Sequence, residues 1–275
     1  MPHVRIASSP LHPGGAPLDL YYQDVGASAA SRDDGGVPPA PPLLILHGGW
    51  GYGFYPFDAA LAALTGERRC VIPDRTGYGR SPRVTAFPPR FHEAAAAEAE
   101  AVLEAVGIER CAIWGHSDGA VIAAWMAVRQ PARYAAVILE ALHVDRAKPR
   151  SRGFFTQMAE DPDSFGDRVT AKLAAEHGAD WRTVLRADGR VWLDLAAAPE
   201  LDTLDGRWPE LRAPVLLLHG SEDPRTEPGE LERVRRAVPQ AELAMIAGAG
   251  HSPHSERAAA AEATVIATRF LRAHT

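Results

Sequence analysis

The stretch Ala112-Ile113-Trp114-Gly115-His116-Ser117-Asp118-Gly119-Ala120 decides how the rest of this 275-residue chain is interpreted. It predicts a short apolar strand that ends at Trp114, a turn of small residues, and a helix from about Gly119 to Arg129. The turn fits the pattern G-x-S-x-G, in which a serine lies on a sharp strand-to-helix turn and only glycine fits two residues to either side. Such a turn raises the Ser117 hydroxyl out of the sheet. The alternative is an ordinary turn in which Ser117 caps the helix.

Apolar runs on both sides of this turn predict further strands. Two edge strands are expected over Val4–Ala7 and Leu18–Val25. Buried strands are expected over residues 43–46, 70–73, 136–139, 214–218 and 243–246, and helices over residues 57–64, 93–106, 229–237 and 255–272. Because strands alternate with helices, we predict a parallel sheet with helices on both faces. Between the second and third strands, Gly26–Pro42 is rich in Gly, Ala, Ser, Asp and Pro, which predicts a flexible surface loop.

One segment interrupts this alternation. Residues 145–211 contain helical patterns with scattered aromatic residues and no strand pattern. We therefore predict two units, a core formed by residues 1–144 and 212–275 and a helical cap formed by residues 145–211. The cap is expected to cover the carboxyl edge of the sheet. The simpler alternative is that its helices only pack on the sheet.

Composition narrows the class of protein. The length suits one large α/β domain with an insertion, and the formal net charge of −6 argues against nucleic acid or an anionic membrane as the main partner. No run of about 18 apolar residues occurs, so no membrane partner is expected. The N-terminus lacks a signal-peptide pattern, and Cys70 and Cys111 lie in apolar runs typical of buried free thiols. Both features predict a cytoplasmic protein.

Four motifs follow one another along the chain. They are His47-Gly48-Gly49-Trp50, the turn around Ser117, Gly220-Ser221-Glu222-Asp223 and Gly250-His251. With these motifs in this order, the chain resembles the α/β-hydrolase superfamily over essentially its whole length. The resemblance implies the α/β-hydrolase fold, a mostly parallel twisted sheet with helices on both faces and a helical lid inserted after the sixth strand.

The resemblance also implies a catalytic triad in the order Ser117, Asp223, His251. A free serine hydroxyl is a poor nucleophile near neutral pH, so it needs a base within hydrogen-bond reach. His251 would accept the proton of Ser117, and Asp223 would bind and orient the imidazole. The backbone N–H groups of Gly49 and Asp118 are the expected oxyanion hole, with Trp50 as a further candidate donor.

Several neighbouring residues compete for these roles or extend them. His254 is the alternative base, and Asp145 is the alternative acid because it follows the strand after the elbow helix. His47 is expected to be structural. Three residues are expected to line the substrate pocket: Trp50, His116 and His143. Two roles stay open for the Asp118 side chain, capping the following helix or contacting the substrate.

These features predict a serine hydrolase that cleaves a small-to-medium carboxylic ester, thioester or lactone through an acyl-enzyme on Ser117. Serine at the elbow differs from the aspartate of haloalkane dehalogenases and epoxide hydrolases. The enzymatic alternative is a carbon–carbon bond hydrolase of the ring-cleavage-product type, which uses the same triad. A non-catalytic receptor on the same fold would lack a triad residue, and none is missing. No paired metal-ligand spacing occurs, so neither metal nor cofactor is expected; the oligomeric state is left open.

Overall fold

The computed structural model describes residues 2–12, 14–26 and 40–275. Within them, eight strands form one sheet in the order β1-β2-β4-β3-β5-β6-β7-β8. The strands are β1 (His3–Ile6), β2 (Leu18–Gly26), β3 (Leu43–Leu46), β4 (Arg69–Pro73), β5 (Cys111–His116), β6 (Tyr134–Glu140), β7 (Val215–Gly220) and β8 (Glu242–Ile246). Strand β2 pairs antiparallel with both neighbours, whereas the strands from β4 to β8 pair in parallel. This arrangement confirms the predicted α/β-hydrolase fold class.

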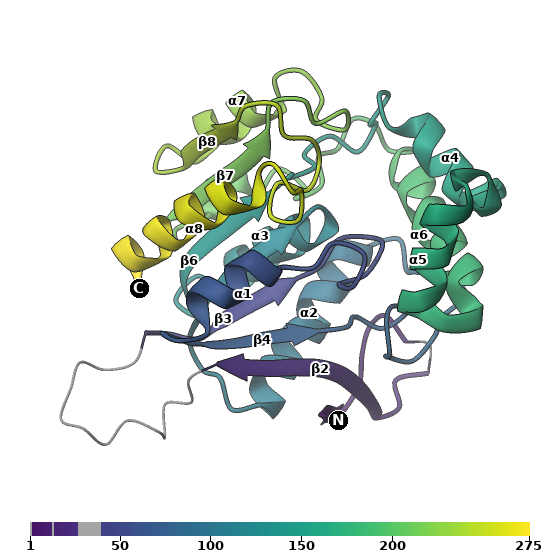
Figure 1. Ribbon diagram of the computed structural model, residues 1–275, viewed down its shortest axis with the longest axis horizontal. Helices are drawn as coiled ribbons and strands as arrows, with labels where there is room; N and C mark the ends of the chain where they lie inside the picture. The colour runs from purple at the N-terminus through teal and green to yellow at the C-terminus, as the bar shows by residue number, and fades with distance from the viewer. Residues whose placement is uncertain (1, 13, 27–39) are drawn as a thin grey trace.

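Helices cover both faces of the sheet (Figure 1). They are α1 (Asp58–Leu64), α2 (Phe91–Ala105), α3 (Asp118–Arg129), α7 (Glu230–Ala237) and α8 (Ala260–His274). Alternate residues of β3 point to opposite faces: Leu43 and Ile45 pack with the residues of α1 and α8, and Leu44 and Leu46 pack with those of α2 and α3. The central strands are therefore buried on both faces, which explains their continuous apolar runs.

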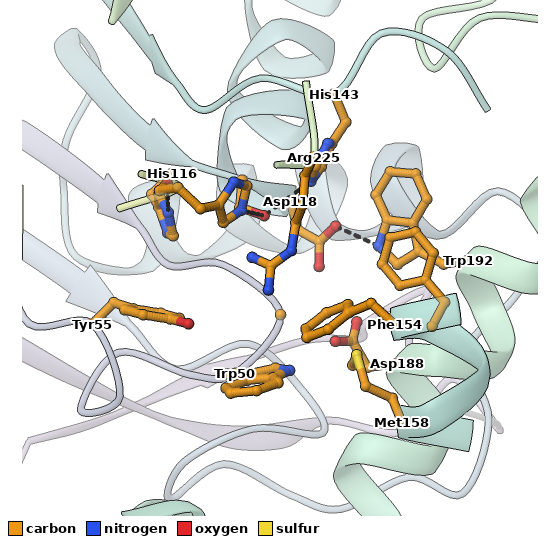
Figure 2. Close-up of a pocket in the computed structure, with 14 residues that line it drawn as sticks. Trp50, Tyr55, His116, Asp118, His143, Phe154, Met158, Asp188, Trp192 and Arg225 are labelled. Atoms are coloured by element: carbon orange, nitrogen blue, oxygen red, sulfur yellow. Dashed lines mark hydrogen bonds between the residues drawn. The ribbon is translucent and has the colours of Figure 1, made fainter. Parts of the chain in front are cut away.

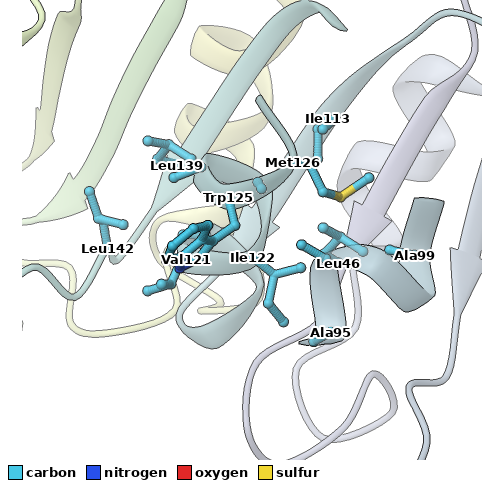
Figure 3. Close-up of a cluster of buried hydrophobic side chains, with 14 of the residues drawn as sticks. Leu46, Ala95, Ala99, Ile113, Val121, Ile122, Trp125, Met126, Leu139 and Leu142 are labelled. Atoms are coloured by element: carbon cyan, nitrogen blue, oxygen red, sulfur yellow. The ribbon is translucent and has the colours of Figure 1, made fainter. Parts of the chain in front are cut away.

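A cluster of buried apolar side chains surrounds α3, the helix that follows Ser117 (Figure 3). Val121, Ile122 and Met126 are fully buried, and they belong to one cluster with Ile113 of β5 and Leu139 of β6. Helix α2 contributes alanines to the same cluster, and small side chains allow the two helices to approach closely. The start of α3, and with it Ser117, is thereby held rigidly against the sheet.

A group of helices follows β6, where the lid was predicted. It contains α4 (Arg152–Glu160), η2 (Pro162–Phe165), α5 (Asp167–His177), η3 (Gly178–Asp180), α6 (Trp181–Leu195) and η4 (Trp208–Glu210). Figure 1 shows α4, α5 and α6 side by side, at the end of the sheet towards which the arrow of β3 points. Near the two ends of the insertion, Asp145 and Asp202 pair in an isolated antiparallel bridge. The division of the chain into two units stays a prediction.

The start of the last helix, α8, differs from the expectation. The closing helix begins at Ala260 and not at Ser255. Before it, the Glu256 side chain accepts hydrogen bonds from the N–H groups of Gly250 and Ser252. The segment before Ala260 is thus shaped by the loop that carries His251. Most of the predicted loop Gly26–Pro42 lies outside the described residues.

Both cysteines match the expectation drawn from their apolar surroundings. Cys70 and Cys111 are buried and free, and burial raises the pKa of both thiols, to about 11 and about 12. No helix in the described parts of the chain has the length and apolar character needed to cross a bilayer.

The contact between α4 and α6 generates a stability prediction. A Cβ atom on Gly189 of α6 would lie 2.6 Å from the Phe155 carbonyl oxygen and 2.7 Å from the Ala159 nitrogen, both in α4. Gly189→Ala should therefore force the two helices apart and lower the free energy of unfolding by about 1–3 kcal/mol. Gly153→Ala is the matched control, since no atom lies within 4 Å of the added Cβ. It should not destabilise the protein; equal losses in urea unfolding would contradict the prediction.

Candidate active site

Ser117 lies on a strained turn between β5 and α3. Its backbone has φ +56° and ψ −118°, a conformation that residues other than glycine rarely adopt. A Cβ on Gly115 would lie 2.1 Å from the Gly119 carbonyl oxygen, and one on Gly119 would lie 2.1 Å from the Leu46 carbonyl oxygen. Only glycine fits at either position, as the pattern of the elbow predicts.

The turn places the Ser117 hydroxyl within reach of His251. Ser117 Oγ lies 3.0 Å from His251 Nε2, and His251 Nδ1 lies 2.9 Å and 3.0 Å from the two carboxylate oxygens of Asp223. The three side chains come from the segments that follow β5, β7 and β8. The strands from β5 to β8 are all parallel, so the carboxyl ends of these strands lie at one edge of the sheet. The structure therefore brings together the residues predicted as nucleophile, base and acid.

The surroundings hold Asp223 ionised and His251 neutral. Burial opposes the ionisation of Asp223 most strongly, but the electrostatic interaction and hydrogen bond with the His251 imidazole, together with the N–H of Arg225, hold the pKa of this carboxyl well below its ordinary value. Burial and then the nearby charge of Arg225 lower the pKa of His251, which Asp223 only partly offsets. A neutral imidazole beside a serine hydroxyl is the protonation state that a general base requires.

The competing candidates are bonded elsewhere. His254 lies 2.8 Å from Glu140 Oε1 through Nδ1 and 2.9 Å from the Tyr55 carbonyl oxygen through Nε2. Asp145 forms an ion pair with Arg233. His47 accepts the N–H of Arg75 at 3.2 Å, which fits the structural role expected for it.

A narrow pocket, with a cavity volume of about 20 Å³, opens beside Ser117 (Figure 2). The five residues predicted for the oxyanion hole and the substrate pocket all line it: Gly49, Trp50, His116, Asp118 and His143. The His143 side chain reaches the nucleophile, with Nε2 at 3.3 Å from Ser117 Oγ and its ring stacked on that of His251. His116 also supports the loop of His251, because its Nε2 lies 3.0 Å from the His251 carbonyl oxygen.

The loop after β3 is fixed against the elbow by a buried arginine. Arg75 donates hydrogen bonds to the carbonyl oxygens of His47 and Gly48. A Cβ on Gly48 would lie 3.1 Å from that of Ser117, so the loop and the elbow are in close contact. Gly49 follows in the same loop and lines the pocket. The role of the Gly49 and Asp118 N–H groups as oxyanion donors stays a prediction.

The Asp118 side chain is directed into a buried polar network instead of capping α3. Its Oδ1 lies 3.1 Å from His92 Nε2 and accepts the indole N–H of Trp192 at 2.9 Å, while Oδ2 lies 3.9 Å from Arg75. Burial opposes ionisation, but the hydrogen bond and charge of His92, and then the charge of Arg75, hold the pKa of Asp118 below its ordinary value. Asp118 is thus an anion inside the pocket wall.

A second carboxyl, Asp188 of α6, belongs to the same wall. Oδ1 accepts the Tyr78 hydroxyl at 3.0 Å, and burial followed by the charge of Asp118 raises the pKa of Asp188 well above its ordinary value. Asp188 therefore keeps its proton and can share it with Asp118. Sequence reasoning missed this residue. The available signal was a charged residue three positions after Leu185 and four before Trp192, on the apolar face of an amphipathic helix.

The aromatic residues of the insertion were noted in the sequence, and Phe154, Phe155 and Trp192 line the pocket, whereas Tyr55, Met158 and Arg225 were missed. The aromatic and aliphatic wall includes Tyr55, Phe154, Phe155, Met158 and Trp192, and Arg225 adds a guanidinium. Phe155 stacks on Trp192 with ring centroids 5.0 Å apart, which joins α4 to α6 behind the pocket. Within the described residues, no group of three or more His, Cys, Asp or Glu side chains is placed to hold a metal ion.

Comparisons with known proteins identify the family. Residues 43–264 match the model of the alpha/beta hydrolase family, to which this chain belongs. It is 31% identical to part of the polyketide synthase ThaQ of Burkholderia thailandensis, covering 94% of this chain but only 13% of that protein. It is 26% identical to the sn-1-specific diacylglycerol lipase ABHD11 of Xenopus tropicalis, covering 81% of this chain and 76% of that one. A thermophilic esterase from Thermogutta terrifontis superposes with a TM-score of 0.72 at 21% identity over the full length of both chains.

The carboxyl pair generates a prediction about charge. Because Asp188 is neutral when folded, the neutral Asp188→Asn should be no less stable than wild type at pH 7. An aspartate that keeps its proton only in the folded state costs stability as pH rises above about 4, so the advantage of Asp188→Asn should grow from pH 4 to 7. Asp118→Asn, the matched variant, leaves Arg75 without its anion and should cost on the order of 3 kcal/mol. Urea unfolding measures the stability of both variants. If Asp188→Asn were the more destabilising of the two, the negative charge would lie on Asp188 and not on Asp118.

Proposed function

We propose that this alpha/beta hydrolase is a serine hydrolase for small-to-medium carboxylic esters, thioesters or lactones. The observation that carries the proposal is the unbroken chain of hydrogen bonds from Ser117 through His251 to Asp223, which begins at a pocket. An ester carbonyl bound in that pocket would lie against a hydroxyl whose proton has an acceptor at 3.0 Å. This geometry is what nucleophilic attack by serine requires.

The reaction would proceed in two halves. Ser117 Oγ attacks the carbonyl carbon while its proton passes to His251 Nε2, and Asp223 stabilises the imidazolium. The oxygen of the tetrahedral intermediate would accept hydrogen bonds from the N–H groups of Gly49 and Asp118. Collapse of this intermediate releases the alcohol, thiol or ring oxygen, which takes the proton from His251. Water, deprotonated by the same imidazole, then hydrolyses the acyl-enzyme on Ser117.

The size of the pocket supports a small substrate. Its cavity volume is about 20 Å³, which holds about one water molecule and lies far below the range usual for ligand sites, so a bulky substrate would have to displace much of the wall. Aromatic rings line it, notably Trp50, Phe154 and Trp192, so each buried methylene of an acyl chain should add about 0.8 kcal/mol until the space is full. We therefore propose acyl groups of short to medium length. On the basis of the net charge, we propose that neither a membrane nor a nucleic acid is a partner. The two free thiols support the proposal of a cytoplasmic location.

The first test concerns the nucleophile. Ser117→Ala should lose about 10⁴–10⁶ in kcat on p-nitrophenyl esters and should not react with a fluorophosphonate probe, because the attacking oxygen is gone. Ser164→Ala, an exposed serine of η2, is the control and should keep both properties. Labelling of the wild type at Ser117 without turnover of any ester, thioester or lactone would favour the carbon–carbon bond hydrolase. Absence of labelling would favour a non-catalytic receptor.

The second test concerns the acid. Asp223→Asn should lower kcat by about 10³–10⁴, because an amide holds the imidazole in the wrong tautomer. Asp145→Asn is the matched control, since Asp145 pairs with Arg233 and not with a histidine, and it should lose far less. Steady-state kinetics on one ester settle the comparison. If Asp145→Asn lost more activity than Asp223→Asn, the acid would be Asp145.

A further inference from the structure

An arginine without an acidic partner lies in the pocket beside the triad. Arg225 follows Asp223 by two residues, and its N–H donates to Asp223 Oδ1 at 2.9 Å, so its backbone is fixed to the triad. The side chain lines the pocket with its guanidinium carbon 4.0 Å from the centre of the Phe154 ring. Figure 2 shows the guanidinium pointing into the pocket between Tyr55 and Phe154, above Trp50.

The guanidinium has no counter-ion within the described part of the chain. None of the ion pairs there involves Arg225, and the Tyr55 hydroxyl is the polar group within hydrogen-bonding reach of it. Two more deeply buried cations are paired, since Arg75 faces Asp118 and Lys148 pairs with Glu230 at 3.0 Å. Buried Arg68 forms no ion pair in the described residues, but it does not line the pocket. A partly buried cation is usually paired, since losing water costs free energy that only an anion or hydrogen bonds restore.

The carboxyls near the pocket do not neutralise this charge. Asp118 faces Arg75 and is hydrogen-bonded to His92, Asp188 keeps its proton, and Asp223 is bonded to His251. The positive charge of Arg225 acts in the pocket itself, because after burial it is the largest cause that lowers the pKa of His251. An anion entering the pocket would thus meet one unpaired cation and no unpaired carboxylate.

We propose that Arg225 binds a carboxylate on the acyl or leaving group, so that the substrate of this hydrolase is an anionic ester, thioester or lactone. A guanidinium presents a planar set of N–H donors that matches a carboxylate with two hydrogen bonds. Stacking on Phe154 leaves the edge of that plane free, and the Tyr55 hydroxyl can donate a further bond. The proposal rests on the proposed function, since it specifies the substrate of the same site.

Binding to a variant that cannot turn over separates this proposal from catalysis. In a Ser117→Ala background, calorimetry would compare monomethyl esters of succinate, glutarate and adipate with the carboxamides of the same length, which differ mainly in charge. The acidic member should bind at least tenfold more tightly at one or more lengths. Adding Arg225→Gln should remove the preference, and adding Arg225→Lys should restore part of it. Arg182→Gln is the control: this arginine of α6 also stacks on an aromatic ring, Trp181, but does not line the pocket.

Three results would overturn the proposal. They are equal binding of acids and amides, a preference that survives Arg225→Gln, and no binding of any acid at millimolar concentration. The Lys variant guards against misfolding of the Gln variant, because it keeps the charge and should keep the preference in part. The proposed function fails separately, through the absence of fluorophosphonate labelling at Ser117 in the wild type.

Discussion

The backbone contact at the elbow is the constraint on which the rest of the site depends. Ser117 can hold a positive φ because Gly115 and Gly119 let β5, α3 and the end of β3 touch without side chains between them. Strain of this kind costs about 1–3 kcal/mol and persists only where the surroundings enforce it. The apolar cluster under α3 supplies that enforcement, since the helix cannot shift without opening the core around Val121 and Met126.

Electrostatic contacts around one buried carboxylate also hold the site together. The first residue of α3, Asp118, is the anion around which Arg75, His92 and Trp192 gather. Each comes from a different segment: the loop after β4, the helix α2 and the helix α6 of the insertion. Arg75 in turn holds the carbonyl groups of the loop that contains Gly49. The elbow, the proposed oxyanion loop and the insertion are therefore coupled through one buried carboxylate. Helix α6 forms part of the pocket wall through Asp188 and Trp192.

The sequence allowed the fold and the three residues of the hydrogen-bonded chain to be predicted because their signals are local. Apolar runs mark the strands, and glycines around Ser117 and before His251 mark the turns. Arg225 lacks such a signal, and the signal of Asp188, a charge on the apolar face of α6, does not say what the side chain contacts. Only packing brings these two side chains into the pocket. The start of α8 was also placed too early, because the alanine-rich sequence favours a helix and does not reveal that Glu256 binds the loop around His251. The roles of Asp188 and Arg225 depend on partners far away in the chain, such as Tyr78 and Phe154.

The unpaired guanidinium has a consequence for the proposed base. In the free enzyme, Arg225 helps to keep the pKa of His251 low, so the imidazole is neutral but a weak proton acceptor. A carboxylate bound to Arg225 would cancel most of that charge, and the pKa of His251 would then rise towards the value that Asp223 favours. His251 would become a stronger base only when an anionic substrate is in place. The same pairing that selects the substrate would thus assist removal of the proton from Ser117, and a neutral ester of the same size would bind without this gain.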